Sequence, residues 1–131
     1  MGANAAEIVS IPKEDPKEDK EKSEQKQVRN VEEIARQYFK DDPILVDIAW
    51  CESRFRQYNS DGSTHRGEVN NRDVGVMQIN EKFHLDRALK LGHDIYTPKG
   101  NMSYAKYLYE RDGLTPWNSS AKCWNKSQIV N

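Results

Sequence analysis

The sequence predicts a small, mainly α-helical domain with a short β-like or loop excursion near its middle. Apolar residues recur at helical spacing on both sides of a polar run at residues 59–71. That run is rich in Asn, Asp, Gly and Ser, which favour turns over helices. With 131 residues, of which 36% are hydrophobic, the chain can form one domain with one core but not two.

Residues 1–28 are expected to form a disordered, charged linker. Residues 10–27 alternate Lys with Glu and Asp, include Pro12 and Pro16, and offer almost nothing to bury. Their charges could also pair four residues apart on a solvated helix, but the two prolines argue against an early helix start. We therefore assign the ordered domain to residues 29–131.

Two helices are predicted between residues 30 and 55. The apolar spacing of residues 30–39 is typical of an amphipathic helix. Asp42 as N-cap and Pro43 at the first position would start a second helix, which runs to about Phe55. Four residues of this second helix share one face, because they are spaced at i, i+3, i+4 and i+7: Leu45, Ile48, Ala49 and Glu52.

Glu52 is the first candidate functional residue, because it is an acid on a stripe that should face the core. Partial desolvation disfavours the carboxylate, and the C-terminal end of a helix repels negative charge, so both effects raise the pKa. A glutamate that keeps its proton near neutral pH can act as a general acid. The alternative is a surface glutamate just beyond the core stripe, which this stretch alone leaves open.

The middle of the chain contains two segments without helical spacing. Asp61 and Gly62 could turn a short hairpin; a calcium loop is not indicated, because the alternating acids and closing glutamate are missing. Residues 73–80 are mostly apolar and too short for a helix. Gly75 in this segment indicates close backbone approach, by a ligand or by a neighbouring helix.

Local signals predict two further helices and an aromatic tail. Asn80 can cap a helix that ends at Gly92, and Thr97 with Pro98 starts another that ends at Gly113. The tail at residues 115–124 is aromatic and polar. Its two tryptophans either fill the core or stack on a ligand.

Three segments of this chain together resemble the lysozyme superfamily, and more closely the soluble lytic transglycosylase (SLT) domains. They are Trp50–Phe55, Asp73–Asn80 and Asn101–Leu108. A glutamate–serine pair alone is weak evidence for this family. The pair followed by a glycine-x-methionine-glutamine motif is a specific signal for it. The resemblance covers about residues 29–124 and implies a lysozyme-like α+β fold with a cleft for a glycan strand of peptidoglycan.

The resemblance also implies roles for individual residues. Glu52 matches the catalytic acid of the family, and the residues matching its substrate-contacting positions or lying in the cleft region are Ser53, Met77, Gln78, Asn80, Tyr104 and Trp117. For two of these the residues themselves favour another role: Met77 as core and Asn80 as a helix cap. The alternatives stay open for Trp117, as a sugar-stacking ring or a core plug, and for Gln78, as a sugar contact or a partner of backbone groups under a loop. A later alanine-tyrosine-asparagine motif, present in many family members, is absent.

The implied reaction cuts the β-1,4 bond between N-acetylmuramic acid and N-acetylglucosamine, with Glu52 donating a proton to the glycosidic oxygen. A lytic transglycosylase then forms a 1,6-anhydro end and needs no second carboxylate. A lysozyme-type hydrolase uses a second acid, for which Asp73 is the candidate; the alternative for Asp73 is a turn residue capping backbone amides. The resemblance favours the transglycosylase over the hydrolase. A non-catalytic peptidoglycan-binding module is the third interpretation.

Cys51 and Cys123 are one potential disulfide, and the alternative is two buried free thiols. We expect the disulfide, because the family resemblance points outside the cytoplasm, where such bonds persist. The protein is accordingly expected to be secreted, periplasmic or cell-wall associated, or delivered to the cell wall by a phage. Residues 1–9 show no signal peptide.

Composition limits the partners. The net charge of -1 gives no indication of nucleic-acid binding, and no stretch is long and apolar enough to span a membrane. His65, His84 and His93 lack the spacing of metal ligands and are interpreted as surface residues. We expect a monomer that needs no metal or cofactor and acts on a peptidoglycan glycan strand.

Overall fold

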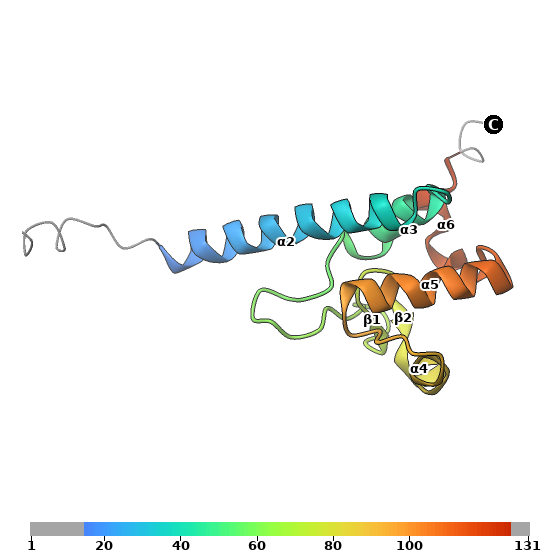
Figure 1. Cartoon of the computed structure of the whole chain (residues 1–131). Coiled ribbons are helices and arrows are strands. Elements are labelled where there is room, and N and C mark those ends of the chain that lie inside the picture. The colour runs from blue at the N-terminus through green and yellow to red at the C-terminus, as the bar shows by residue number, and fades with distance from the viewer. Residues whose placement is uncertain (1–14, 127–131) are drawn as a thin grey trace, which may run out of the picture.

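A computed structural model describes residues 15–126 of the chain, and within them the domain is mainly helical with a two-stranded antiparallel sheet (Figure 1). This confirms the predicted class, a small mainly α-helical domain with a short β excursion. The elements, in chain order, are α2 (Pro16–Tyr38), α3 (Ile44–Ser53), β1 (Asp73–Val74), β2 (Ile79–Asn80), α4 (Glu81–Lys90), α5 (Pro98–Asp112), the 3-10 helix η1 (Thr115–Ser120) and α6 (Ala121–Trp124).

Helix α2 departs most from the sequence prediction. Residues 16–28, expected in a disordered linker, belong to the same helix as the amphipathic segment at 30–38. Asp15 caps the helix by accepting a hydrogen bond from the Lys17 amide, and Pro16 occupies the first turn, where its missing N–H is not needed. Pro16 therefore starts the helix instead of preventing it. Residues 1–14 of the expected linker lie outside the described residues.

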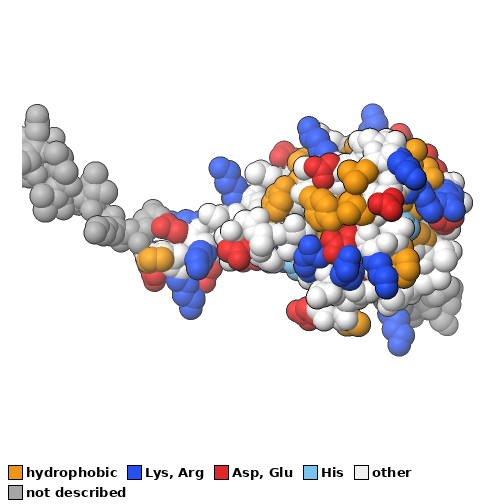
Figure 2. All heavy atoms as spheres, turned by 90° about the horizontal axis from the view of Figure 1, so that it is seen from below, with side chains coloured by type: hydrophobic (Ala, Val, Ile, Leu, Met, Phe, Trp, Pro, Cys, Tyr) orange, Lys and Arg blue, Asp and Glu red, His pale blue; other side chains and the backbone are white. Residues whose placement is uncertain are grey.

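Contacts with the loop after α3 also hold the N-terminal half of α2. The Glu24 carboxylate pairs with Arg56 at 2.8 Å, and the Gln27 side chain accepts hydrogen bonds from the amides of Gln57 and Tyr58 at 2.9 and 2.8 Å. These partners are far away in sequence, so the linker prediction could not include them. Only the first turns of α2 project from the rest of the domain (Figure 1, Figure 2).

The other helices begin close to their predicted starts. Asn80 accepts a hydrogen bond from the Phe83 amide at the start of α4, and Thr97 accepts one from the Gly100 amide at the start of α5. Helix α3 differs slightly: Pro43 is its N-cap, and no side chain caps it, so Asp42 does not have the predicted capping role. Within residues 15–126, no helix combines the length and hydropathy that crossing a bilayer requires.

The β excursion is smaller than a full hairpin at its predicted turn. The turn at Asp61 and Gly62 closes a single antiparallel bridge between Tyr58 and Thr64. The paired strands come from the next segment, 73–80, where Asp73 faces Asn80 across the ladder. Residues 73–80 therefore form a short antiparallel hairpin, some of whose residues line one groove together with the end of α3.

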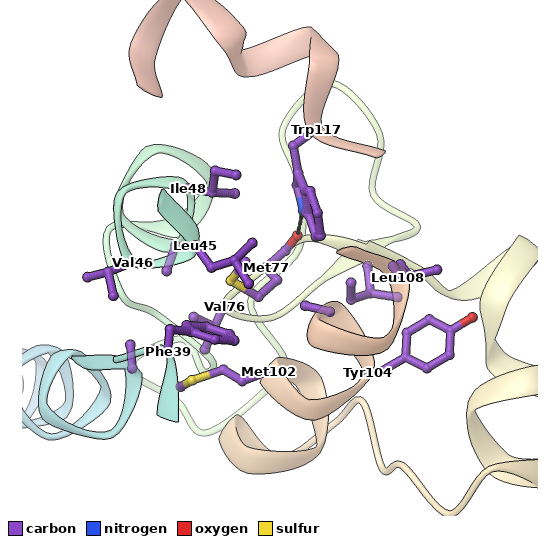
Figure 3. Packing of buried hydrophobic residues seen from close by; sticks show 14 of the residues in the cluster. Phe39, Leu45, Val46, Ile48, Val76, Met77, Met102, Tyr104, Leu108 and Trp117 are labelled. Atoms are coloured by element: carbon purple, nitrogen blue, oxygen red, sulfur yellow. Dashed lines mark hydrogen bonds between the residues drawn. The ribbon is translucent and has the colours of Figure 1, made fainter. Parts of the chain in front are cut away.

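The core lies between α2, α3, α5 and the short C-terminal helices (Figure 3). The stripe predicted on α3 is confirmed, since Leu45, Ile48 and Ala49 are completely buried and Glu52 at its end is half-buried. The largest of the other fully buried side chains are Trp117, Tyr104, Phe39, Met77, Ile95, Met102 and Leu108. Truncating a buried residue such as Leu45 or Ile48 to Ala would cost about 2–5 kcal/mol of stability.

The predicted disulfide is confirmed. Cys51 of α3 is bonded to Cys123 of α6, with their Cα atoms 5.9 Å apart and a sequence separation of 72. Closing a loop of this length stabilises the fold by about 4 kcal/mol in the chain-entropy account. The bond fixes the C-terminal helices against α3, one residue before Glu52.

Candidate active site

A groove of about 580 Å³ opens beside the C-terminal end of α3. Its lining includes Glu52, Arg54, Asn59, Arg66, Asp73, Gln78 and Ser119, with the loop at 65–70 along one side. Glu24 of α2 also lines it, so the segment that was expected to be a linker contributes to a wall of the groove. A smaller hollow of about 130 Å³, called here the side hollow, adjoins the groove.

Four residues line both the groove and the side hollow, namely Glu52, Asp73, Gln78 and Ser119. The two carboxyl groups therefore lie where the two spaces meet. Pockets that take large ligands combine such concave surfaces with a few convergent polar groups. This junction is the candidate active site.

The environment of Glu52 favours its protonated form. Burial is the largest influence on its pKa and raises it, and the negative charge of Asp73 raises it further. A hydrogen bond from the Ser120 hydroxyl to Glu52 Oε2, at 2.7 Å, opposes these effects without cancelling them. The pKa of Glu52 is thus raised above its usual value, as the position of this acid on the core stripe predicts.

The backbone around the groove adopts unusual conformations. In the described part of the chain, the three non-glycine residues with positive φ are Arg54, Phe55 and Gln78, at 55°, 63° and 51°. Such conformations are unfavourable for side chains with a Cβ and concentrate at functional sites. Two of the three, Arg54 and Gln78, line the groove.

Asp73 is oriented by its partner across the β ladder. Its Oδ1 accepts a hydrogen bond from Asn80 Nδ2 at 3.0 Å, while the Asn80 side-chain oxygen caps α4. Asn80 is therefore a helix cap that also holds Asp73, and both ends of its amide already have partners. This agrees with the capping interpretation of Asn80 more than with direct sugar binding.

Two buried amides hold the turn that carries Gln78 into the groove. Gln57 Oε1 accepts a hydrogen bond from the Val76 amide at 3.1 Å, and Asn101 Oδ1 accepts one from the Met77 amide at 2.8 Å. A Cβ at Gly75, which has a φ of +75°, would collide with both of these side chains. The close approach predicted at Gly75 is thus made by interior side chains and not by a ligand.

Three residues predicted to contact substrate, Ser53, Met77 and Tyr104, have little exposed surface. Ser53 donates a hydrogen bond to the Ala49 carbonyl and accepts one from the Arg56 amide, which ties down the end of α3. Met77 and Tyr104 are completely buried. Met77 and Tyr104 line neither the groove nor the side hollow, whereas Ser53 is among the residues that line the groove, with its hydroxyl already paired to the backbone.

Trp117 also belongs to the core. Its ring is 2% exposed, and its indole N–H donates a hydrogen bond to the Met77 carbonyl at 2.9 Å, the dashed line in Figure 3. Trp117 borders the side hollow, but it is held from inside as a core plug. Gln78 lines both the groove and the side hollow, and its Nε2 donates a hydrogen bond to the Gly75 carbonyl at 3.1 Å.

Two residues of the site were not predicted from the sequence. Ser120 donates to Glu52, although the polar tail that contains it shows no periodic pattern. His84 lines the side hollow, where its Nδ1 lies 2.9 Å from the Tyr104 hydroxyl, and burial lowers its pKa. In Figure 3 this hydroxyl is turned away from the other labelled core residues. His84 was interpreted as a surface residue because the histidines lack metal-ligand spacing, and its partner Tyr104, on another helix, gives no signal in the sequence.

No group of three or more His, Cys, Asp or Glu side chains within residues 15–126 is arranged to hold a metal ion. The junction thus holds a carboxyl group with a raised pKa, that of Glu52, beside the second acid Asp73. A carboxyl group with a raised pKa is a candidate for general acid catalysis.

Comparisons of the chain with protein-family models, with curated proteins and with solved structures gave no match. The basis for a function is therefore the motif residues of the sequence and the geometry of the groove.

Proposed function

We propose that this protein cuts the glycan strands of peptidoglycan between N-acetylmuramic acid and N-acetylglucosamine, as a lytic transglycosylase. The observation that carries the proposal is the position of Glu52. Its carboxyl is half-buried at the junction of the groove and the side hollow, with a raised pKa. An acid of this kind is what protonation of a glycosidic oxygen requires near neutral pH.

In the proposed reaction, protonated Glu52 donates its proton to the oxygen that joins the two sugars. The bond from this oxygen to C1 of N-acetylmuramic acid breaks, and positive charge develops on that ring. The Glu52 carboxylate then takes the proton of the 6-hydroxyl of the same sugar, whose oxygen bonds to C1. The products are a 1,6-anhydro end and a free 4-hydroxyl; no water is consumed and Glu52 has its proton again.

Charged side chains and side chains with amide or hydroxyl groups both line the groove. Gln78 and Ser119 are among the latter, and Gln78 is held in place by the turn described above and by a hydrogen bond from its Nε2 to the Gly75 carbonyl at 3.1 Å. N-acetyl and hydroxyl groups of sugars are suitable partners for such side chains. The disulfide supports a site of action outside the cytoplasm, where the bond would persist.

Hydrolysis is the second candidate, and one observation favours it. Asp73 lines both the groove and the side hollow, is oriented by Asn80, and acts electrostatically on Glu52. A lysozyme-type enzyme would use Asp73 as nucleophile or charge stabiliser, with water completing the reaction. In both reactions Glu52 would be the acid and the same glycosidic bond would be cut. The two reactions are therefore distinguished by their products.

Digestion of purified peptidoglycan in H₂¹⁸O, followed by mass spectrometry of the released muropeptides, tests the proposal. A lytic transglycosylase gives anhydro ends without the label, whereas a hydrolase gives reducing ends that carry it. Glu52→Gln is the matched control and should release neither product. Intact glycan that nevertheless co-sediments with the native protein would indicate a binding module and contradict the proposal.

A further inference from the structure

Ser120 is the residue of η1 that directly contacts the candidate acid. Its hydroxyl oxygen lies 2.7 Å from Glu52 Oε2, 2.9 Å from Trp124 Nε1 and 3.1 Å from the Trp117 carbonyl oxygen. Trp124 Nε1 also lies 3.2 Å from that carbonyl. One hydroxyl thus connects the acid to an indole, which can only donate, and to a carbonyl, which can only accept.

A serine hydroxyl has one proton to donate and two lone pairs. When Glu52 is ionised, Ser120 can donate to Oε2 and accept from Trp124, whose N–H also reaches the Trp117 carbonyl. When Glu52 is protonated on Oε1, Oε2 is a carbonyl oxygen that still accepts from Ser120, while the Trp124 N–H keeps its two acceptors. In both states each of these groups has a partner, and no heavy atom needs to move.

We propose that Ser120 is the positioning residue of Glu52, holding Oε2 in place in both protonation states while Oε1 serves the groove. In the described part of the chain the hydrogen bond of the Glu52 carboxyl falls on Oε2, which leaves Oε1 for a ligand. The function of this device depends on the proposed reaction, in which Glu52 gives up a proton and takes one back. The hydrogen-bond geometry itself does not depend on that reaction.

The disulfide keeps this arrangement together. Cys51 directly precedes Glu52, and Cys123 lies between Ser120 and Trp124 in the chain. The covalent bond therefore joins the helix of the acid to the helices of its partners. Trp124 is itself 5% exposed, so its N–H is fixed in the interior where Ser120 can use it.

Other charges around Glu52 must be kept constant when Ser120 is tested. Those that line the groove or the side hollow are Asp73 on β1, His84 on α4, Glu24 on α2, Arg54 and Arg56 after α3, and His65, Arg66 and Glu68 in the loop. Of these, Asp73 is the one whose charge contributes to the pKa shift of Glu52. A substitution at Ser120 leaves all of them in place.

The test combines Ser120→Ala with Ser120→Thr, which keeps the hydroxyl, and with Asn118→Ala, an exposed control in the same 3-10 helix. The ionisation of the Glu52 carboxyl is followed by NMR of ¹³C-labelled glutamate, and cutting of peptidoglycan by its pH profile. The NMR titration needs no substrate, so it tests Ser120 even if the native protein cuts nothing. Thermal unfolding confirms that each variant is folded.

For Ser120→Ala we expect the pKa of Glu52 to rise above its native position, because the ionised carboxylate loses its donor. The pH profile of cutting should move in the same direction, with kcat/KM lower by roughly tenfold because the acid is less well placed. Ser120→Thr should restore both readouts, and Asn118→Ala should change neither. A Ser120→Ala variant that titrates and cuts like the native protein would overturn the proposal, as would a Ser120→Thr variant that is folded but not restored.

Discussion

The C-terminal end of α3 and the N-terminal end of α4 each carry a glutamate, Glu52 and Glu81, and the pKa values of the two carboxyl groups are shifted in opposite directions. Glu52 is half-buried, receives a hydrogen bond from a neutral hydroxyl, and has a raised pKa. Glu81 accepts hydrogen bonds at 2.7–2.8 Å from Arg66, Arg72 and Tyr96, and these lower its pKa to about 2.

The two helix ends act in the same sense as the side chains. A helix N-terminus favours negative charge and a C-terminus disfavours it, so the backbone supports ionisation of Glu81 and opposes that of Glu52. The ion pairs of Glu81 with Arg66 and Arg72 connect α4 to the loop before β1. These contacts require that Glu81 is negatively charged. The carboxylate of Glu81 is thus stabilised by hydrogen bonds from two arginines and a tyrosine, whereas the hydrogen bond to Glu52 comes from the neutral hydroxyl of Ser120.

Of the substitutions that test this comparison, Glu52→Gln is expected to have the largest effect on activity. Without a general acid, cutting of peptidoglycan should fall by about 10²–10⁴-fold. Because the folded state raises the pKa of Glu52, ionisation costs the native protein stability at pH values above that pKa. The variant should therefore be at least as stable as the native protein at neutral pH, by urea denaturation, and this advantage should fade as the pH is lowered. Normal cutting would contradict the assignment of the acid.

Removal of the disulfide should have the next largest effect. The double variant Cys51→Ser with Cys123→Ser lacks the link between α3 and α6, and should lose about 2–4 kcal/mol of unfolding free energy. Chemical denaturation of the variant and of the native protein, both without reductant, measures this difference. Equal stabilities would show that packing alone holds α6 in place.

Substitution of Glu81 tests the other side of the comparison. Glu81→Gln removes a carboxylate whose folded-state pKa is depressed, so its contribution is fully present above the usual value of 4.5 and is lost as the pH falls towards about 2. Because its arginines are partly solvated, we expect a loss of only about 1–2 kcal/mol at neutral pH. Urea denaturation at neutral pH and near pH 2 should show a deficit that disappears in acid. Glu110→Gln, at an exposed position, is the control and should show no deficit at either pH.

The smallest effect is expected for Asp73→Asn. Removing this charge should lower the pKa of Glu52, because the charge of Asp73 contributes to raising it. A lytic transglycosylase should lose no more than about tenfold in cutting rate, since Asp73 forms no bond in that reaction. The rate of muropeptide release, compared with that of an exposed control, Asp86→Asn, measures the loss. A loss as large as that of Glu52→Gln would instead favour the hydrolase.

Features that depend on neighbours in the chain could be predicted from the sequence. The caps at Asn80 and Thr97, the buried stripe of α3 and the position of Glu52 at its end follow from local capping and helical spacing. The fold class, the sum of such local elements, was accordingly predicted correctly. The pairing of Cys51 with Cys123 was also predictable, because the chain has no other cysteines.

Features that depend on distant partners could not be predicted. The first half of α2 is held by residues 56–58, and Ser120 reaches Glu52 across a separation of 68 residues. Gln57 and Asn101 are polar residues that the sequence gives no reason to bury, yet they satisfy the backbone of the turn around Gly75. Their role appears only once the helices are packed together.

A pH titration of the glutamate carboxyl carbons of the native protein by NMR tests the central claim most directly. The resonances of Glu52 and Glu81 are assigned with the Glu52→Gln and Glu81→Gln variants. We predict that Glu52 ionises above the usual 4.5 and that Glu81 ionises well below it, at about 2. A Glu52 carboxyl that ionises at or below its usual pKa would contradict the claim that burial raises its pKa, and the proposed reaction would lose its acid.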